Sequence, residues 1–241
     1  MRRRGARILS RLANSRASRP IRTLANALLG RRTRIVRVRS GVARGARMEL
    51  DLVHEKAYWL GHHEPELQET LREHVGQGSV VYDVGAHIGF FSLCSARLGA
   101  SVVAFEPDPG NAARLRRNVE LNDAAVEVIE AAVSDADGEV ALDAGDSASE
   151  RTIRPGRGVR AVTLSKFAAH RPPPTLIKID VEGAEGRVLR GASSLLVQAA
   201  PVVVCEVHGE EAESEVRAAL SRYELVELGS RWRVLALPRD R

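Results

Sequence analysis

The sequence predicts an α/β domain with a doubly wound, mostly parallel sheet of seven strands, preceded by a basic segment and a β-hairpin. From Ser79 onward, short apolar runs alternate with stretches of helical period, which is typical of a parallel sheet with helices on both faces. Two of these runs end in a carboxylate followed by a helix start. The 241 residues, 44% of them hydrophobic, suffice for one sizeable core, so we expect one main domain over residues 61–241.

The basic residues are concentrated at the N-terminus. Fifteen arginines and no acidic residue precede Glu49, and the remainder has 21 basic against 31 acidic side chains, a net charge of about −10. We expect residues 1–33 to form a leader that is helical or disordered. The apolar spacing over 4–12 and 24–29 is typical of short helices that lie on an anionic membrane. A solvated leader and an organelle transit peptide are the alternatives.

The sequence also indicates where the protein resides. Cys94 and Cys205 lie within apolar runs, where free thiols usually behave as small buried hydrophobes, so a reducing compartment fits best. No apolar run reaches the roughly 18 to 20 residues of a membrane helix, and the N-terminus lacks the apolar core of a secretory signal. We therefore expect a cytoplasmic protein, with membrane contact limited to peripheral binding at the inner surface through the leader.

The elements follow from hydrophobic periodicity. Residues 34–60 are expected to cover the domain or its site, with a β-hairpin between Arg34 and Leu52, where apolar residues alternate and glycines mark the turn. The expected strands of the main domain are 80–84, 101–105, 126–131, 176–180, 202–207, 224–227 and 233–237.

Helices and one loop are expected between these strands. Asp108 and Pro109 mark one helix start, and an apolar stripe over 188–196 predicts a second helix. Residues 136–160, rich in Gly, Asp and Ser, are expected to form a hairpin and a mobile loop.

The first candidate ligand site is the segment from Asp83 to Gly89, where a strand ends in a carboxylate and two glycines, Gly85 and Gly89, open a helix. In a doubly wound sheet, ligands bind where strands end and helices begin, and glycine lets the backbone approach them closely. The glycine spacing differs from that of dinucleotide-binding loops. A carboxylate here instead suits the cationic amino-acid end of S-adenosylmethionine, and we expect Ala86 and His87 to contact the same ligand. Tight turns also use such residues for steric reasons alone.

Two further strand ends extend this candidate site. The next strand ends at Glu106, 23 residues after Asp83, where a carboxylate can accept both ribose hydroxyls of a nucleoside, and Pro107 follows it. The alternative is a solvated carboxylate near a helix start. At the end of the third strand, Ala132 and Val133 suit the wall of an adenine pocket, although ordinary core would use the same residues.

The densest acidic group follows the fourth strand, where Asp180, Glu182 and Glu185 lie close together. Such a cluster must be solvated, paired or functional. Asp180 ends the strand, beside the expected position of a transferred methyl group. For the two glutamates, the alternative to a functional role is to complement a helix dipole. The fifth strand ends with Glu206 and His208 on one face. A histidine beside carboxylates is a candidate general base.

These segments together resemble the FkbM family of methyltransferases over roughly Gly61 to His208. The resemblance is carried by residues 83–89, 105–107, 132–135, 178–185 and 206–208. The block 178–185 is the most family-specific, whereas the glycine motif is shared by most class I, Rossmann-like methyltransferases. The segment 63–67 also resembles the family's entry segment, which implies that Glu64 approaches the cofactor.

The resemblance implies that the chain uses S-adenosylmethionine to methylate a hydroxyl oxygen on a small-molecule or glycan acceptor. Most of the acceleration should come from positioning the oxygen in line with the sulfonium methyl group. We expect Asp180 or His208 to be the base, with Glu182 and Glu206 orienting the acceptor. Carboxylates favour hard cations, but no ligand spacing supports a metal, so none is predicted.

Two positions depart from the family's pattern. His87 stands where the family usually has Asn, which is expected to alter cofactor contacts. Ser165 stands where an Asp is common, which is expected to remove a helix cap or an acceptor contact.

Two other functions remain as alternatives. The arginine-rich leader would suit a nucleic-acid methyltransferase, but the body is acidic and has few aromatic residues to stack on a flipped base, so we do not expect a nucleic-acid partner. A binding module that has lost activity is the other alternative, because fold alone never establishes catalysis. Retention of Asp83, Glu106 and Asp180 together argues against it.

Overall fold

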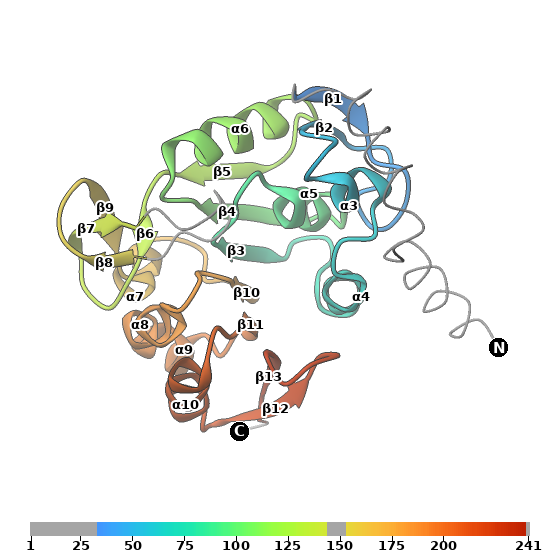
Figure 1. Ribbon diagram of the computed structural model, residues 1–241. Helices are drawn as coiled ribbons and strands as arrows, with labels where there is room; N and C mark the ends of the chain where they lie inside the picture. Colours follow the sequence, from blue (N-terminus) through green and yellow to red (C-terminus); the bar gives the residue numbers. More distant parts are fainter. Residues whose placement is uncertain (1–32, 144–152, 240–241) are drawn as a thin grey trace, which may run out of the picture.

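The computed structural model describes residues 33–143 and 153–239 (Figure 1). The elements of the main sheet and the helices beside them are β3 (Val80–Val84), α5 (Phe90–Arg97), β4 (Ser101–Phe105), α6 (Pro109–Glu120), β5 (Val126–Ile129), α7 (Leu164–Ala168), β10 (Leu176–Ile179), α8 (Glu185–Gly191), α9 (Ser193–Gln198), β11 (Val202–Glu206), α10 (Glu210–Ala219), β12 (Tyr223–Glu227) and β13 (Arg233–Pro238). Four short elements precede them: β1 (Arg34–Arg37), β2 (Arg47–Leu50), α3 (Lys56–Leu60) and α4 (Pro65–His74).

The main sheet has seven strands in the order β12-β13-β11-β10-β3-β4-β5. The five strands from β11 to β5 run parallel, whereas β13 is antiparallel to both of its neighbours. The chain moves outward from β3 to β5 and then returns to place β10 on the other side of β3. This order confirms the predicted doubly wound, mostly parallel sheet, and it creates a switch point between β3 and β10, where ligands bind in such folds.

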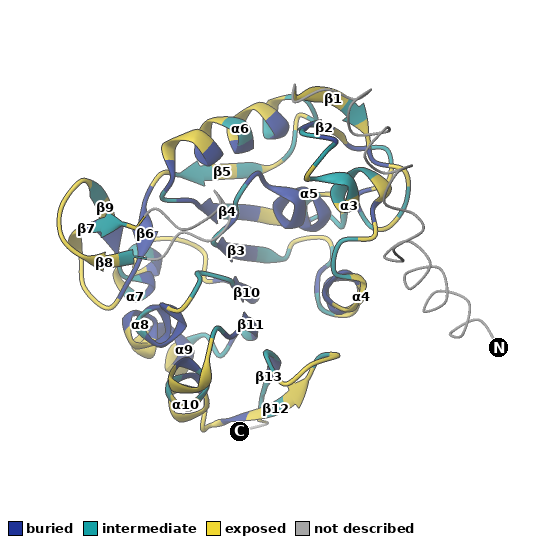
Figure 2. Cartoon of the chain, viewed as in Figure 1, coloured by how far each residue is buried: buried dark blue, intermediate teal, exposed yellow. Residues whose placement is uncertain are grey.

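Successive residues of the central strands pack into two separate cores, one on each face of the sheet. On β3, Val81 packs with α4 and α5, whereas Tyr82 packs with α7 to α10 on the opposite face. Side chains alternate between the faces of a strand, so a strand covered on both sides must be apolar at consecutive positions. Figure 2 shows these strands buried between exposed outer helix faces.

The predicted hairpin is confirmed as the antiparallel pair β1 and β2. Met48 and Leu50 of β2 are fully buried in the core that also contains α4 and α5, so the hairpin is attached to the α5 face of the sheet. Residues 34–50 do not line the pocket described below. The hairpin therefore covers the domain rather than the site.

The strand predicted over 126–131 is shorter in the structure. β5 ends at Ile129, and the chain then enters a second, four-stranded sheet with the order β6-β9-β7-β8. Its strands are β6 (Ala132–Val133), β7 (Gly138–Leu142), β8 (Ile153–Pro155) and β9 (Val159–Val162). β7 and β8 form the hairpin expected within 136–160. The central part of the expected loop, 144–152, lies outside the described residues.

The prediction of a single helix over 188–196 was wrong, because the structure has two helices there. α8 ends at Gly191, Ala192 has non-helical backbone angles, and α9 begins at Ser193. A Cβ atom at Gly191 would lie 2.0 Å from the carbonyl oxygen of Ser134, so α8 packs against the small sheet where it ends. The apolar stripe predicted the buried face correctly but could not reveal this tertiary contact.

Two further expectations concern the environment of the chain. Both cysteines are free and fully buried, as predicted. Among the described residues, no helix is long and apolar enough to cross a membrane. The predicted leader lies almost entirely outside the described residues, and the division of the chain at 33 and 60 stays a prediction.

Candidate active site

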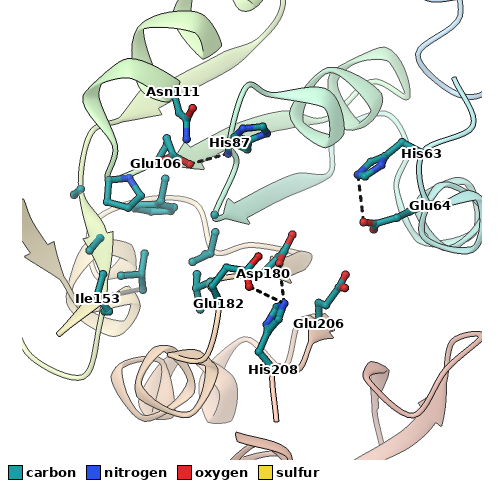
Figure 3. Close-up of a pocket in the computed structure, with 18 of the residues that line it drawn as sticks. His63, Glu64, His87, Glu106, Asn111, Ile153, Asp180, Glu182, Glu206 and His208 are labelled. Carbon is teal, nitrogen blue, oxygen red and sulfur yellow. Dashed lines mark hydrogen bonds and ion pairs between the residues drawn. The ribbon is translucent and has the colours of Figure 1, made fainter. Parts of the chain in front are cut away.

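A pocket of about 280 Å³ opens at the carboxyl ends of the central strands, on the switch point between β3 and β10 (Figure 3). Glu106, Asn111 and Ile153 lie at one end and His63 and Glu64 at the other, with an acid and imidazole cluster between them. The lining residues are Tyr58, His63, Glu64, Val84, Gly85, His87, Phe105, Glu106, Pro107, Asn111, Ala131, Ala132, Val133, Ile153, Asp180, Val181, Glu182, Glu206 and His208.

The turn after β3 brings two strand ends into close contact. Gly85 has a φ of 77°, and a Cβ atom there would lie 1.8 Å from the carbonyl oxygen of Asp180. Only glycine fits this conformation and this approach without strain. Gly89 directly precedes α5, and Ala86 packs with Ala104 and Leu115 beneath α6. Of these predicted cofactor contacts, Gly85 lines the pocket, whereas Ala86 and Gly89 support the turn from behind.

Asp83 does not line the pocket, although the sequence suggested that it would meet the ligand. It is 1% exposed, accepts a 2.6 Å hydrogen bond from Ser92 Oγ, and lies 3.3 Å from Lys178 Nζ. Lys178 also donates to the Gly85 carbonyl oxygen and lies 3.4 Å from Asp180 Oδ2. Burial alone would lower the pKa of Lys178, but the two carboxylates outweigh it and raise that pKa. Lys178 therefore joins the glycine turn to Asp180 from beneath the pocket.

Glu106 is held by its own turn. Its two oxygens accept the backbone N–H groups of His87 and Asp108 at 2.8 and 2.9 Å. Burial raises the pKa of Glu106 to about 7, and these two hydrogen bonds limit the rise. The Asn111 side chain also hydrogen-bonds to Glu106. A carboxylate has about four lone-pair sites, so one remains for a further donor from the pocket. Pro107, Ala132 and Val133 line the same end of the pocket, and their contact with a cofactor stays a prediction.

The two positions that depart from the family's pattern lie in different places. His87 lines the pocket with a φ of 50°, and its Nδ1 is 3.5 Å from the Tyr58 hydroxyl. Burial lowers the pKa of His87 to about 4, so the ring is neutral at physiological pH. Ser165 lies in α7, away from the pocket, and its hydroxyl accepts the backbone N–H of Leu195.

Glu64 and Glu206 are joined by Arg233, which the sequence did not single out. The Arg233 Nη2 atom lies 2.6 Å from Glu206 Oε2 and 3.2 Å from Glu64 Oε2. His63 Nε2 is 3.2 Å from the other Glu64 oxygen. Burial opposes ionisation of Glu64, but the His63 hydrogen bond and the Arg233 charge hold its pKa below the usual value. This group fixes the wall opposite Glu106.

The predicted catalytic residues Asp180, Glu182 and His208 meet in the middle of the pocket (Figure 3). His208 Nε2 lies 3.3 Å from Glu182 Oε2 and 4.0 Å from Asp180 Oδ1. On its other side, Nδ1 is 2.6 Å from Glu185, which is completely buried. The hydrogen bond to Glu185 raises the pKa of His208 to about 9 against the effect of burial.

Several residues of the site were missed by the sequence analysis. Tyr58 and Asn111 line the pocket, and neither stands in a pattern that distinguishes it from a surface residue. Lys178 gave a usable signal, because a lysine between isoleucines of a buried strand needs an ionic partner. Arg233 gave none, since it meets its partners only through the antiparallel pairing of β13 with β11.

Two methyltransferases are similar to this chain in sequence. It is 28% identical to the hexuronic acid methyltransferase AglP of Haloferax volcanii over 67% of the chain and 70% of that protein. It is 33% identical to the 31-O-demethyl-FK506 methyltransferase FkbM of Streptomyces tacrolimicus over 54% of the chain and 66% of that protein.

A solved structure has a fold similar to that of this chain. The 16S rRNA N2 G1207 methyltransferase of T. thermophilus, in complex with AdoMet and guanosine, has a TM-score of 0.50 and 17% identity, covering 86% of this chain and 50% of that one. The model of the methyltransferase FkbM domain matches residues 83–231, more than half of the chain. The chain therefore belongs to the FkbM family of S-adenosylmethionine-dependent methyltransferases.

Proposed function

We propose that this chain transfers the methyl group of S-adenosylmethionine to a hydroxyl oxygen of a sugar or natural-product acceptor. The observation that carries the proposal is the pocket at the switch point, which has a buried carboxylate at one end and the Asp180 group in its middle. Family membership supports methyl transfer. The names of the two curated relatives, one acting on a hexuronic acid and one on a demethylated natural product, support this class of acceptor.

The residues at the Glu106 end fit a nucleoside. The Glu106 carboxylate suits the ribose hydroxyls as a hydrogen-bond acceptor, while Phe105, Val133 and Ile153 offer apolar surface for the adenine ring. Asp83 is paired with Ser92 and Lys178 and does not line the pocket, whereas Glu64 does. We therefore assign the ligand's ammonium group to Glu64, at the other end of the pocket, rather than to Asp83.

The acceptor is proposed to lie beside Asp180, in the middle of the pocket. When bound, the cofactor supplies a methyl group activated by the sulfonium. Asp180 accepts the proton of the attacking hydroxyl as the new carbon–oxygen bond forms and the carbon–sulfur bond breaks. Lys178 fixes one Asp180 oxygen from below, and Glu182 and Glu206 orient the acceptor. Positioning of the oxygen in line with the methyl group provides most of the acceleration.

Calorimetry with S-adenosylmethionine tests the cofactor assignment. We expect saturable binding to the wild type and at least a tenfold loss of affinity in Glu106→Ala. Absence of binding to the wild type would rule out the proposed function. The acceptor is identified by mass spectrometry of extracts from wild-type and deletion cells, in which one metabolite or glycan should lack a 14-dalton increment, the mass of a methylene group.

A further inference from the structure

We propose that Asp180, Glu182 and His208 bind a divalent metal cation at the acceptor end of the pocket. The site itself is defined by these side chains alone, whereas its role with an acceptor rests on the proposed function. Sequence spacing gave no indication of it, because the ligands come from the β10–α8 loop and from the end of β11.

The three side chains converge on one point. One ligand atom from each lies within 4.8 Å of the other two, and all three side chains line the pocket. Bonds of about 2.0–2.2 Å to a single small cation place ligand atoms at most about 4.4 Å apart. Small rotations of the three side chains therefore suffice to bind one ion.

The environment of His208 independently favours a cation. Glu185 lies behind the ring, completely buried, and its Oε2 atom has no hydrogen-bond partner. Its other oxygen is 2.6 Å from His208 Nδ1, an arrangement that places a proton on Nδ1. Nε2 lies beside the Glu182 and Asp180 carboxylates, so in a ring protonated at Nδ1 alone its lone pair faces the same point as their oxygens. A histidine held by a buried carboxylate in this way is typical of metal sites.

The negative charge of the pocket also favours a bound cation. Among the described residues that line it, five are carboxylates and none is a lysine or an arginine. Two neighbouring cations are already shared, because Lys178 contacts Asp83 and Asp180, and Arg233 contacts Glu64 and Glu206. A bound cation would offset the excess negative charge that an acceptor must otherwise meet.

The ligand set indicates the type of ion and its use. Two carboxylates and one imidazole suit a borderline-hard ion such as Mn²⁺ better than Mg²⁺, which prefers oxygen alone. Three protein ligands leave coordination positions open for the acceptor. An acceptor with two neighbouring hydroxyls, or with a hydroxyl beside a carboxylate, can chelate the ion. Coordination lowers the pKa of the hydroxyl and so assists its deprotonation beside Asp180.

The test is Mn²⁺ binding to the full chain after removal of bound metal with EDTA and exchange into EDTA-free buffer, measured by loss of the free-ion EPR signal and by calorimetry. We expect one saturable site in the wild type, and at least a tenfold weaker affinity in Glu182→Gln and in His208→Phe. The matched control is Glu206→Gln, which removes a charge from the same pocket but not from the cluster, and should stay within about threefold of the wild type. Thermal unfolding checks that each variant is folded.

The outcomes separate this proposal from the function on which its role rests. Saturable Mn²⁺ binding that Glu182→Gln and His208→Phe weaken supports the site even if S-adenosylmethionine does not bind. Failure of the wild type to bind Mn²⁺, or equal affinities in the wild type and both variants, would overturn it. If S-adenosylmethionine binds in EDTA while the wild type takes up no Mn²⁺, a doubly protonated His208 fills the cluster and only the cation site is lost.

Discussion

Lys178 lies beneath the pocket, where it contacts Asp83, Asp180 and the Gly85 carbonyl oxygen. Replacing Lys178 with Met keeps the volume but leaves Asp83 buried without its counter-charge. We expect the free energy of unfolding to fall by about 3–5 kcal/mol, measured by urea denaturation. Arg116→Met, which removes the exposed partner of Glu130, should cost less than about 1 kcal/mol. Equal losses in the two variants would show that the buried pair contributes no more to the free energy of unfolding than the exposed pair does.

The raised pKa of Glu106 leads to a prediction about how stability depends on pH. Its pKa is raised from 4.5 to about 7 by burial, against the N–H groups of Asp108 and His87, while the Asp108 charge adds to the rise. The ionised form therefore costs the ligand-free protein about 3 kcal/mol, so this group lowers the stability as pH rises from about 4.5 to 7.

The affinity for S-adenosylmethionine should also depend on the ionisation of Glu106, but it should rise with pH where the stability falls. Ribose hydroxyls donate to the carboxylate, so affinity for S-adenosylmethionine should rise by up to about tenfold per pH unit below pH 7 and level off above it. Calorimetry from pH 5.5 to 8 measures this. In Glu106→Gln the rise should be absent, and comparison with it cancels titration of the ligand's own amino group. A wild-type profile that parallels the variant's would contradict the assignment.

The residues foreseen from the sequence were those that end strands. Glu106 and Asp180 could be placed because parallel strands bring their carboxyl ends to one edge of the sheet. Asp83 was assigned a ligand contact for the same reason, but its side chain points into the α5 layer, toward Ser92 and Lys178. Strand position fixes where a residue lies, whereas pairing with distant side chains decides what it contacts.

Among the elements, the turn from β3 to α5 is the most constrained. Gly85→Ala would require a left-handed alanine whose Cβ atom overlaps the Asp180 carbonyl oxygen. We expect a loss of about 2–5 kcal/mol in urea unfolding, together with at least tenfold weaker cofactor binding.

Gly78 provides the control for this prediction. It has a φ of 82°, and a Cβ atom there would meet nothing within 4 Å. Gly78→Ala should therefore cost about 1 kcal/mol, the penalty of the left-handed conformation alone. If Gly85→Ala costs no more than Gly78→Ala, the close approach of the two strand ends does not limit stability.

The seven main strands were predictable because each is a short, mostly apolar run bounded by polar or turn residues. The four-stranded sheet was not, since β6 and β8 are three residues or fewer and are defined only by pairing with β9 and β7. The break between α8 and α9 was missed for a similar reason. Local periodicity reports which face is buried, but not which neighbour interrupts an element.

At the scale of the whole molecule, the separation of charge along the chain leads to a further prediction. The arginines before Glu49 oppose an acidic body, and the described residues that line the pocket all lie at or beyond Tyr58. Deleting residues 1–32 should leave the affinity for S-adenosylmethionine within about twofold of the wild type. The deletion should reduce co-sedimentation with anionic vesicles, because clustered arginines are attracted to anionic lipid. Unchanged sedimentation would remove the proposed membrane contact.

β13 lies between β11 and β12 in the sheet, and its first residue, Arg233, bridges Glu64 and Glu206. During synthesis on the ribosome, the earlier strands can assemble as they emerge, but this pocket wall also needs a residue of β13, which follows every other strand of the main sheet along the chain. We therefore expect a nascent chain that stops before residue 233 to fold only in part and to have no affinity for the ligand, so that the ability to bind arises once β13 has emerged rather than gradually.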